Sequence, residues 1–145
     1  MKIMVAVDDT QHSRRAVEFL TRTRWPAGSR MVVVSVLSPP AVSATELPLP
    51  IRAEIEASQR LQAEAAIEHA EGMLREAGFC AAGRVLVGDP RDALVLAAKE
   101  ERADLLVLGS HGRTGLARML LGSVSSHAVN HCSCSVLVVK EEGGK

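Results

Sequence analysis

A stretch punctuated by glycines, in the last third of the chain, carries the residue types best suited to binding an anion. Gly109 and Gly112 are followed, after nine further residues, by the pair Gly122-Ser123. Glycines let a ligand approach the backbone closely. A helix that begins at Ser123 would present free N–H groups and the positive end of its dipole. With the hydroxyl of Ser125 nearby, these features predict a cradle for a phosphate chain.

Other features of this stretch limit the kind of phosphate site it could form. His111 and Arg113 stand inside it and could contact phosphates. It contains neither the Gly-x-x-x-x-Gly-Lys-Ser/Thr pattern of a P-loop nor the Gly-x-Gly-x-x-Gly pattern of a dinucleotide fold. Glycine-rich loops between strands and helices are also common where nothing binds. The glycines alone therefore leave two interpretations open, a phosphate cradle and an empty loop.

Titratable side chains elsewhere suggest a binding site more than a catalytic one. Asp8 and Asp9 follow the first apolar run. Neighbouring residues at a strand end point opposite ways, so a shared proton is not expected. Asp8 is predicted to bind a ligand. The polar pair Asp9-Thr10 can cap the next helix, and Asp9 is predicted as a capping group. His111 is expected to donate a hydrogen bond to phosphate, with a general-acid role as the alternative. His12 and His69 are predicted to face solvent.

A second cluster of potential ligands lies close to the C-terminus. His127 and His131 are four residues apart on a predicted helix and so share a face. Cys132 and Cys134 follow at once, which raises the possibility of a zinc site. The Cys-x-Cys spacing is tighter than the usual Cys-x2-4-Cys of zinc sites. Ordinary packing or a thiol pair is therefore the preferred interpretation.

The elements that would position these residues alternate between short apolar runs and longer amphipathic segments. Continuous apolar runs are typical of strands buried on both faces of a parallel sheet. Such alternation predicts an open, doubly wound α/β sheet, which binds ligands at the carboxyl ends of its strands. The predicted strands are residues 3–7, 31–37, 85–87, 105–108 and 136–139, and the predicted helices are residues 10–24, 51–77, 92–102 and 123–131. The buried stripe of the second helix is predicted to hold Ile55, Ala66, Ala70, Met73, Leu74 and Ala77.

Composition narrows the function classes further. The 145 residues fit one domain, residues 1–145. Seventeen basic residues balance 17 acidic ones, and aromatics make up 2%. Nucleic-acid binders usually need a basic surface or stacking aromatics, so no nucleic-acid partner is expected. No apolar run reaches a membrane span or a secretory core. Three cysteines do not build a disulfide scaffold. We therefore expect a cytoplasmic protein with no membrane partner.

The glycine pattern also carries a family resemblance. Gly-x2-Gly-x9-Gly-Ser, filled by Gly109, Gly112, Gly122 and Ser123, resembles the ATP-binding motif of the universal stress protein family. Residues 3–8, 85–90, 103–108 and 135–140 are similar to strand segments of that family, so the resemblance covers nearly the whole chain. Two departures are Asp9-Thr10, where the family often has Gly-Ser, and Ser135 in place of a proline.

The resemblance implies a specific fold and a specific site. The fold is Rossmann-like, a five-stranded parallel sheet in the order 3-2-1-4-5 with two helices on each face. The nucleotide would lie over the carboxyl ends of strands one and four. Carried over by position, the residues implied for adenine and ribose are Ala6, Asp8, Val36, Leu108 and Gly109, and those implied for the phosphates are His111, Gly112, Arg113, Gly122, Ser123, Val124 and Ser125.

The resemblance also implies cofactors, partners and a role. The ligand would be ATP or another adenine nucleotide (ADP, AMP or cyclic AMP), with Mg²⁺ or Mn²⁺ bound through the phosphates and not by protein ligands. A homodimer would form through the last strand, from Ser135 to Lys140. The role would be that of a nucleotide-dependent regulator in the stress response, acting on a downstream protein. The alternatives are a weak ATPase or nucleotidyl-transfer enzyme, and a dimeric interaction protein without nucleotide.

Overall fold

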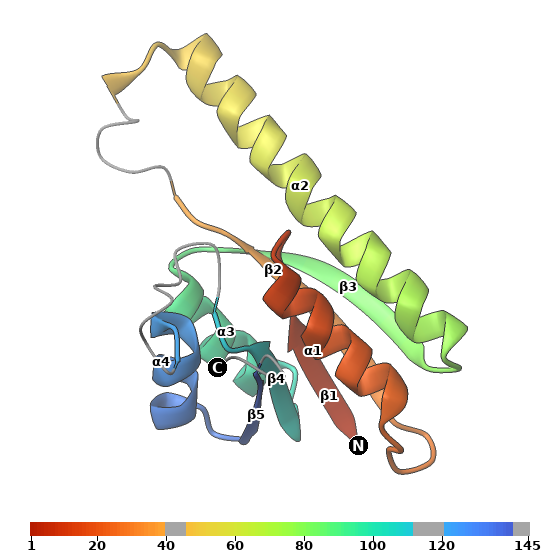
Figure 1. Ribbon diagram of the computed structural model, residues 1–145. Coiled ribbons are helices and arrows are strands. Elements are labelled where there is room, and N and C mark those ends of the chain that lie inside the picture. Colours follow the sequence, from red (N-terminus) through yellow and green to blue (C-terminus); the bar gives the residue numbers. More distant parts are fainter. Residues whose placement is uncertain (40–45, 112–120, 141–145) are drawn as a thin grey trace, which may run out of the picture.

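The structure is a computed structural model that describes residues 1–39, 46–111 and 121–140. Strands and helices alternate along these residues (Figure 1). In chain order they are β1 (Lys2–Ala6), α1 (Gln11–Arg22), β2 (Arg30–Leu37), α2 (Leu49–Glu76), β3 (Cys80–Val87), α3 (Pro90–Glu100), β4 (Leu105–Gly109), α4 (Ser123–His131) and β5 (Ser135–Val139).

The strands form one parallel sheet in the order β3-β2-β1-β4-β5, which confirms the predicted fold. The strand β1 is central: Met4 pairs with Val32 of β2 on one side and with Leu106 of β4 on the other. Along the chain, β2 and β3 are added on one side of β1, and β4 and β5 are then added on the other side. The carboxyl ends of β1 and β4 therefore lie side by side at the point where strand order reverses, which is where such sheets bind ligands.

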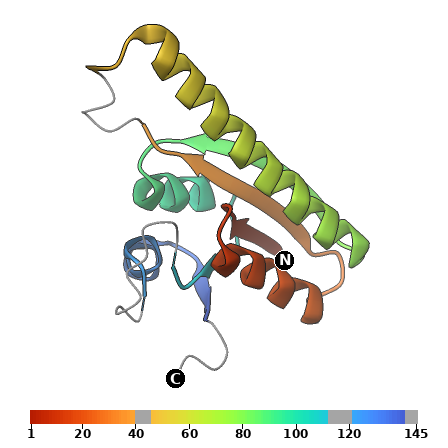
Figure 2. The same ribbon diagram turned by 45° about the horizontal axis from the view of Figure 1, so that its top comes forward.

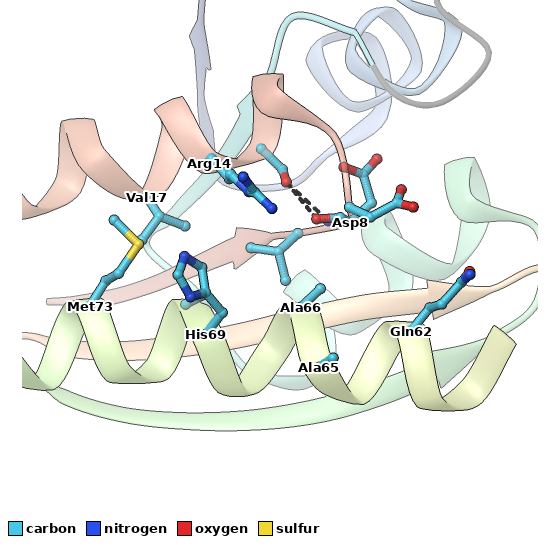
Figure 3. Close-up of a pocket in the computed structure, with 12 residues that line it drawn as sticks. Asp8, Arg14, Val17, Gln62, Ala65, Ala66, His69 and Met73 are labelled. Carbon is cyan, nitrogen blue, oxygen red and sulfur yellow. Dashed lines mark hydrogen bonds between the residues drawn. The ribbon is translucent and has the colours of Figure 1, made fainter. Parts of the chain in front are cut away.

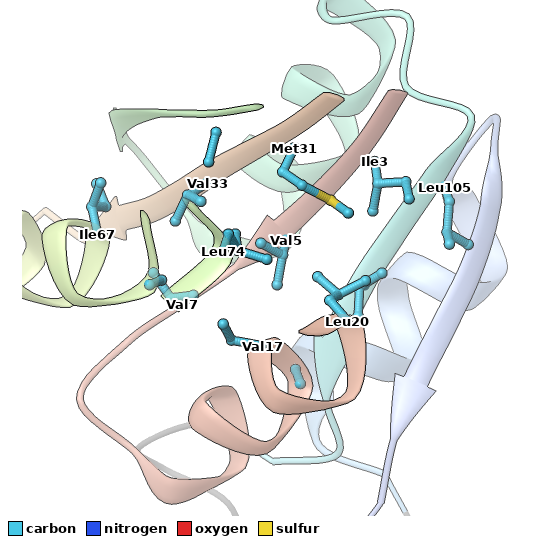
Figure 4. Packing of buried hydrophobic residues seen from close by; sticks show 14 residues of the cluster. Ile3, Val5, Val7, Val17, Leu20, Met31, Val33, Ile67, Leu74 and Leu105 are labelled. Carbon is cyan, nitrogen blue, oxygen red and sulfur yellow. The ribbon is translucent and has the colours of Figure 1, made fainter. Parts of the chain in front are cut away.

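Two helices cover each face of the sheet, again as predicted (Figures 1 and 2). Side chains of β1 alternate between the two faces. Ile3 and Val5 pack in the cluster under α1 and α2, whereas Met4 packs in the cluster under α3 and α4. Figure 4 shows Val5 close to Val17 and Leu20 of α1. All five side chains are at most 1% exposed, and burying each stabilises the fold by about 1.5–3 kcal/mol.

The strand β3 differs from its prediction. It begins at Cys80, five residues earlier than the apolar run at 85–87 suggested, and pairs with β2 along its whole length. Its first half lacks an apolar run because an edge strand needs fewer buried side chains, and most of β3 is exposed. Gly83 lets α2 cross closely, since a Cβ there would lie 2.1 Å from Ile67 Cγ2.

The helix α2 also departs in part from its predicted buried stripe. Ala70 and Leu74 are buried, and Ala66 and Met73 pack partly against the core. Ile55 is 38% exposed, because the first turns of α2 extend beyond the sheet (Figure 1). Ala77 is exposed as well, since the helix has already ended. Although α2 is 28 residues long, no helix in the described ranges is apolar enough over its length to cross a membrane.

The helix α3 begins where its cap and proline place it. The Asp89 carboxylate accepts a hydrogen bond from the Arg91 N–H (2.9 Å) and so caps the helix. Pro90 is the first helical residue, so α3 starts two residues before the prediction. The side-chain hydrogen bond from Arg91 lowers the pKa of Asp89, so this capping carboxylate stays ionised further into the acid range.

Candidate functional site

A cavity of about 500 Å³ opens at the carboxyl ends of β1, β2 and β4, within the size range of small-molecule sites. It gathers the predicted site residues from four separate segments of the chain. Gly112 and Arg113 lie outside the described residues. The other ten all line this one cavity: Ala6, Asp8, Val36, Leu108, Gly109, His111, Gly122, Ser123, Val124 and Ser125.

Several further residues of the cavity wall were not predicted. Gln59 and Ala63 come from the middle of α2, and Leu94 from α3. No local pattern marks them, because they reach the cavity only through the packing of whole helices onto the sheet. Pro90 could have been predicted as a cavity residue, since it follows the turn at the end of β3. Ser13 comes from α1, in the predicted helix 10–24. The remaining residues belong to the predicted strands 3–7 and 31–37 or follow the second of them directly: Val7, Ser35, Leu37 and Ser38.

The start of α4 forms one side of the cavity, and its chemistry suits an anion. Gly122 is the residue before the helix, and the first helical hydrogen bond runs from the Ser126 N–H to the Gly122 carbonyl (3.0 Å). The N–H groups of Ser123 and Val124 come before Ser126 in the helix, so they have no acceptor within it. Within the described residues no side chain caps this helix end. Uncapped N–H groups at the positive end of a helix dipole are a favourable position for phosphate oxygens.

The two described glycines of the motif are needed for close contacts within the protein. A Cβ at Gly109 would lie 2.7 Å from the backbone carbonyl group of His12 in α1. A Cβ at Gly122 would lie 3.3 Å from the Ser110 carbonyl oxygen and 3.4 Å from His111 Cα. Neither glycine has a positive φ. The absence of a side chain thus lets α1 and the start of α4 pack against the end of β4.

Ser125 has a structural role that the sequence did not reveal. It is 3% exposed, and its hydroxyl donates a hydrogen bond to the Gly109 carbonyl (2.8 Å). The Ser125 hydroxyl proton is therefore used in this hydrogen bond, which holds α4 against β4. Ser123, in contrast, is exposed at the first helical position. Of the two hydroxyls, that of Ser123 is the one available to a ligand.

The turn after β1 fixes Asp8 beside the cavity. The Thr10 N–H (2.8 Å) and the Thr10 hydroxyl both donate to Asp8 Oδ1, whereas Oδ2 has no such bond within the described residues. The Ser13 hydroxyl accepts from the Asp8 N–H (3.1 Å) and lies 2.9 Å from the Asp8 carbonyl (Figure 3). The cap of α1 is Thr10, whose hydroxyl accepts from the Ser13 N–H. The prediction that Asp9 caps this helix is therefore wrong.

A smaller cavity of about 220 Å³ lies between α1 and α2 and adjoins the first one (Figure 3). Both cavities share Val7, Asp8 and Ser13, so the turn after β1 separates them. Asp9 lines only the smaller cavity, whose walls also include Arg14. Asp8 and Asp9 therefore share the smaller cavity, and of the two only Asp8 also lines the larger one.

His111 has an unexpected neighbour in His12. Their rings meet edge to face, with centroids 5.3 Å apart. Both Nδ1 atoms are buried, and neither has a hydrogen-bond partner among the described residues. The prediction that His12 faces solvent is wrong, because the close approach of α1 to Gly109 places this ring beside the cavity. His69 is exposed as predicted and lines the smaller cavity.

The histidines and cysteines near the C-terminus are not among the described residues that line either cavity. The rings of His127 and His131 are stacked at a tilt, with centroids 4.2 Å apart, and His127 Nε2 lies 3.5 Å from Asp92 Oδ1. Cys132 Sγ and Cys134 Sγ are 3.4 Å apart. In the part of the chain that the structure describes, no group of three or more potential ligands is arranged to hold a metal ion.

The sequence is similar to known proteins over almost its whole length. The model of the universal stress protein family matches residues 1–140. Universal stress protein MJ0531 of Methanocaldococcus jannaschii is 38% identical over 80 residues, which are 55% of this chain and 47% of that protein. The chain thus spans about half the length of this curated relative.

Solved structures share the fold. The structure of protein MJ0577 superposes with a TM-score of 0.86 at 24% identity, covering 99% of this chain and 97% of that one. A universal stress protein in complex with cAMP gives a TM-score of 0.67 at 28% identity, with 96% and 95% covered. A family protein of Arabidopsis thaliana with AMP bound gives 0.73 at 21% identity, with 99% and 93% covered. The match over residues 1–140 is decisive: this chain belongs to the universal stress protein family.

Proposed function

We propose that this protein binds an adenine nucleotide, with ATP as the expected ligand, in the cavity at the carboxyl ends of β1 and β4. One observation carries the proposal: a single cavity brings the uncapped start of α4 opposite the fixed carboxylate of Asp8. The first suits phosphate and the second suits a ribose hydroxyl. The complex of a relative with cAMP, at 28% identity, supports the same ligand class.

The lining suggests how the nucleotide lies. Ala6, Val36 and Leu108 offer aliphatic walls for the base. Because the described lining contains no Phe, Trp or Tyr to stack on the base, main-chain hydrogen bonds would also be needed. The phosphates lie at Ser123 and Val124, with His111 beside them. Gly112 and Arg113 join the phosphate site on the strength of the sequence motif alone. Mg²⁺ or Mn²⁺ would be held through the phosphates, as is usual for magnesium with nucleotides.

The proposed output is regulation and not chemistry. A nucleophilic or general-base mechanism needs a base that a third group orients. The Nδ1 atom of His111 has no such orienting partner among the described residues. We therefore propose a regulator in the cytoplasm, whose nucleotide-bound state is read by a downstream protein during stress.

The same proposal includes a homodimer formed through the segment from Ser135 to Lys140, which contains β5. This strand pairs with β4 on one side and ends the sheet on the other. Its side chains from Val136 to Val139 are only partly buried in the single chain. Exposed edge strands are commonly covered by a partner, and a second copy of β5 would cover this one.

The experiment that tests the nucleotide proposal begins with the purified protein. The protein is denatured, and any released nucleotide is identified by mass spectrometry. Its affinity is then measured by calorimetry for ATP, AMP and cAMP, with and without Mg²⁺. We expect an adenine nucleotide to be recovered or to bind, in preference to the matching guanine nucleotide. Recovery of no nucleotide, together with no heat of binding for any of them, contradicts the proposal.

A further inference from the structure

Two thiols at the junction of α4 and β5 are in direct contact. Cys132 Sγ and Cys134 Sγ lie 3.4 Å apart, and both residues are free cysteines that are partly exposed. A disulfide needs a sulfur separation of about 2.0 Å. The two sulfurs are therefore in contact but not bonded, and closing a disulfide requires them to move closer together.

The backbone explains why the two sulfurs meet. Cys132 ends α4, with its N–H bonded to the Ala128 carbonyl (2.9 Å), and continues in an extended conformation. Side chains two residues apart in an extended segment lie on the same side. The chain bends at Ser133 and Cys134 before β5 begins at Ser135, and this bend closes the distance between the side chains. The contact is thus built into the connection between a helix and a strand.

The two thiols are not equivalent. Burial, together with the hydrogen bond to Cys132, raises the pKa of Cys134 to about 11, so Cys134 keeps its proton at neutral pH. It can donate that proton in the hydrogen bond to the Cys132 sulfur. Since the thiolate is the reactive form of cysteine, the raised pKa disfavours Cys134 as the first sulfur to attack. The 3.4 Å contact places Cys134 to resolve a product formed on Cys132.

We propose that Cys132 and Cys134 form a modification site, at which a hydroperoxide converts the dithiol reversibly into an intrachain disulfide. The Cys132 thiolate attacks one peroxide oxygen, so the O–O bond breaks and an S–O bond forms. The products are the sulfenic acid of Cys132 and the alkoxide or hydroxide, which takes a proton to give alcohol or water. Cys134 sulfur then attacks Cys132 sulfur, the S–O bond breaks, and water leaves with the Cys134 proton. The pair loses two electrons to the peroxide, and an external thiol restores it.

The third cysteine provides a control within the same chain. Cys80 lies on β3, at the opposite edge of the sheet from β5, and is exposed. It cannot reach either of the other two sulfurs within one molecule. The Cys80→Ser variant therefore isolates the pair and removes disulfides that could link two molecules through Cys80.

The test uses the full chain, reduced and then treated with one equivalent of hydrogen peroxide. In Cys80→Ser we expect the intact mass to fall by two hydrogen atoms, both thiols to resist alkylation, and a reductant to restore both. In Cys80→Ser/Cys134→Ser we expect a sulfenic acid on Cys132 that a dimedone probe captures. Folding of each variant is checked by circular dichroism.

Other outcomes overturn the proposal. If Cys80→Ser keeps two alkylatable thiols after peroxide, the pair does not close. If it gains oxygen atoms in place of losing hydrogens, the cysteines oxidise independently. A disulfide that appears only as a covalent dimer in Cys80→Ser also contradicts an intrachain bond. None of these readouts depends on nucleotide, so this proposal and the proposed function fail separately.

Discussion

At the scale of single residues, the glycines of the motif serve packing as directly as they could serve a ligand. The sequence predicted Gly109 and Gly122 as site residues from their spacing, and both line the cavity. It could not predict why Gly109 must be glycine, because His12 lies 97 positions earlier in the chain and meets Gly109 only in the folded sheet. The hydrogen bond from Ser125 to Gly109 was hidden for the same reason.

The Gly109→Ala variant should lose stability. Its Cβ would lie 2.7 Å from the His12 backbone, so α1 must shift away from β4. We expect a loss of about 1–3 kcal/mol in the free energy of unfolding, as for overpacked cores. Gly72→Ala in α2 is the matched control, since its Cβ would meet open space; it should gain about 0.5–1 kcal/mol. Urea denaturation of both variants measures the difference, and equal stabilities would contradict this packing role.

The two serines at the start of α4 should separate stability from binding. Ser125→Ala leaves the Gly109 carbonyl without its donor and should reduce the free energy of unfolding by about 1 kcal/mol. Ser123→Ala removes an exposed hydroxyl and should leave stability unchanged. We expect it to weaken ATP binding about tenfold, which corresponds to about 1.4 kcal/mol. Calorimetry and urea denaturation check the pair. An unchanged affinity in Ser123→Ala would remove this hydroxyl from the proposed phosphate site.

At the scale of elements, the sequence predicted best where burial is greatest. The strands β1, β2 and β4 are continuous apolar runs because both faces are covered, and α4 was predicted at its observed bounds. The edge strand β3 was predicted too short, since partial exposure permits polar residues and alanines. The stripe of α2 was predicted too long, because helical periodicity does not show where the sheet beneath a helix ends.

Glu101 joins three elements and should make stability depend on acid pH. Lying at the end of α3, its carboxylate accepts hydrogen bonds from Lys2 of β1 (3.2 Å) and Arg84 of β3 (2.7 Å). Burial alone would raise the pKa of Glu101, but these hydrogen bonds outweigh burial and lower it. A lowered pKa in the folded state means that the stabilisation is complete above the ordinary value near 4.5 and is lost as pH falls through the folded value.

Glu101→Gln should therefore lower the free energy of unfolding at neutral pH by about 0.5–1 kcal/mol, the range of partly exposed ion pairs. The difference from the unsubstituted protein should shrink as pH falls below 4.5. Glu100→Gln is the control, because Glu100 is more exposed and has one longer contact with Arg84 (3.4 Å). Denaturation curves between neutral and acid pH test this. A difference that stays constant with pH would exclude an ionic origin.

At the scale of the whole molecule, the alternation of strands and helices was enough to predict a doubly wound parallel sheet, because right-handed crossovers leave few other arrangements. The strand order itself came from the family resemblance and is confirmed. The shape of the cavity was beyond sequence reasoning, since α2 and α3 contribute walls that no motif marks. The unpaired edge of β5 is the feature of the whole fold on which the proposed homodimer depends.

A charge placed on that edge should break the proposed dimer. Val138→Lys puts a cation on β5, a common natural means of preventing edge pairing. We expect light scattering after size exclusion to give twice the chain mass for the unsubstituted protein and the single mass for the variant. Val87→Lys on the opposite edge strand, at an already exposed side chain, is the control and should leave the mass unchanged. A monomeric unsubstituted protein would contradict the dimer.

The central claim, a nucleotide site at the start of α4, is tested most directly by thermal unfolding with ATP and Mg²⁺. Ligand at 100 times its Kd should add about 2.7 kcal/mol to the stability of the unsubstituted protein. Gly122→Ala displaces Ser110 and His111 by a few tenths of an ångström at the phosphate side and should lose this gain while remaining folded. Gly72→Ala, with open space around its Cβ, should keep it. An equal gain in all three proteins would place the site elsewhere.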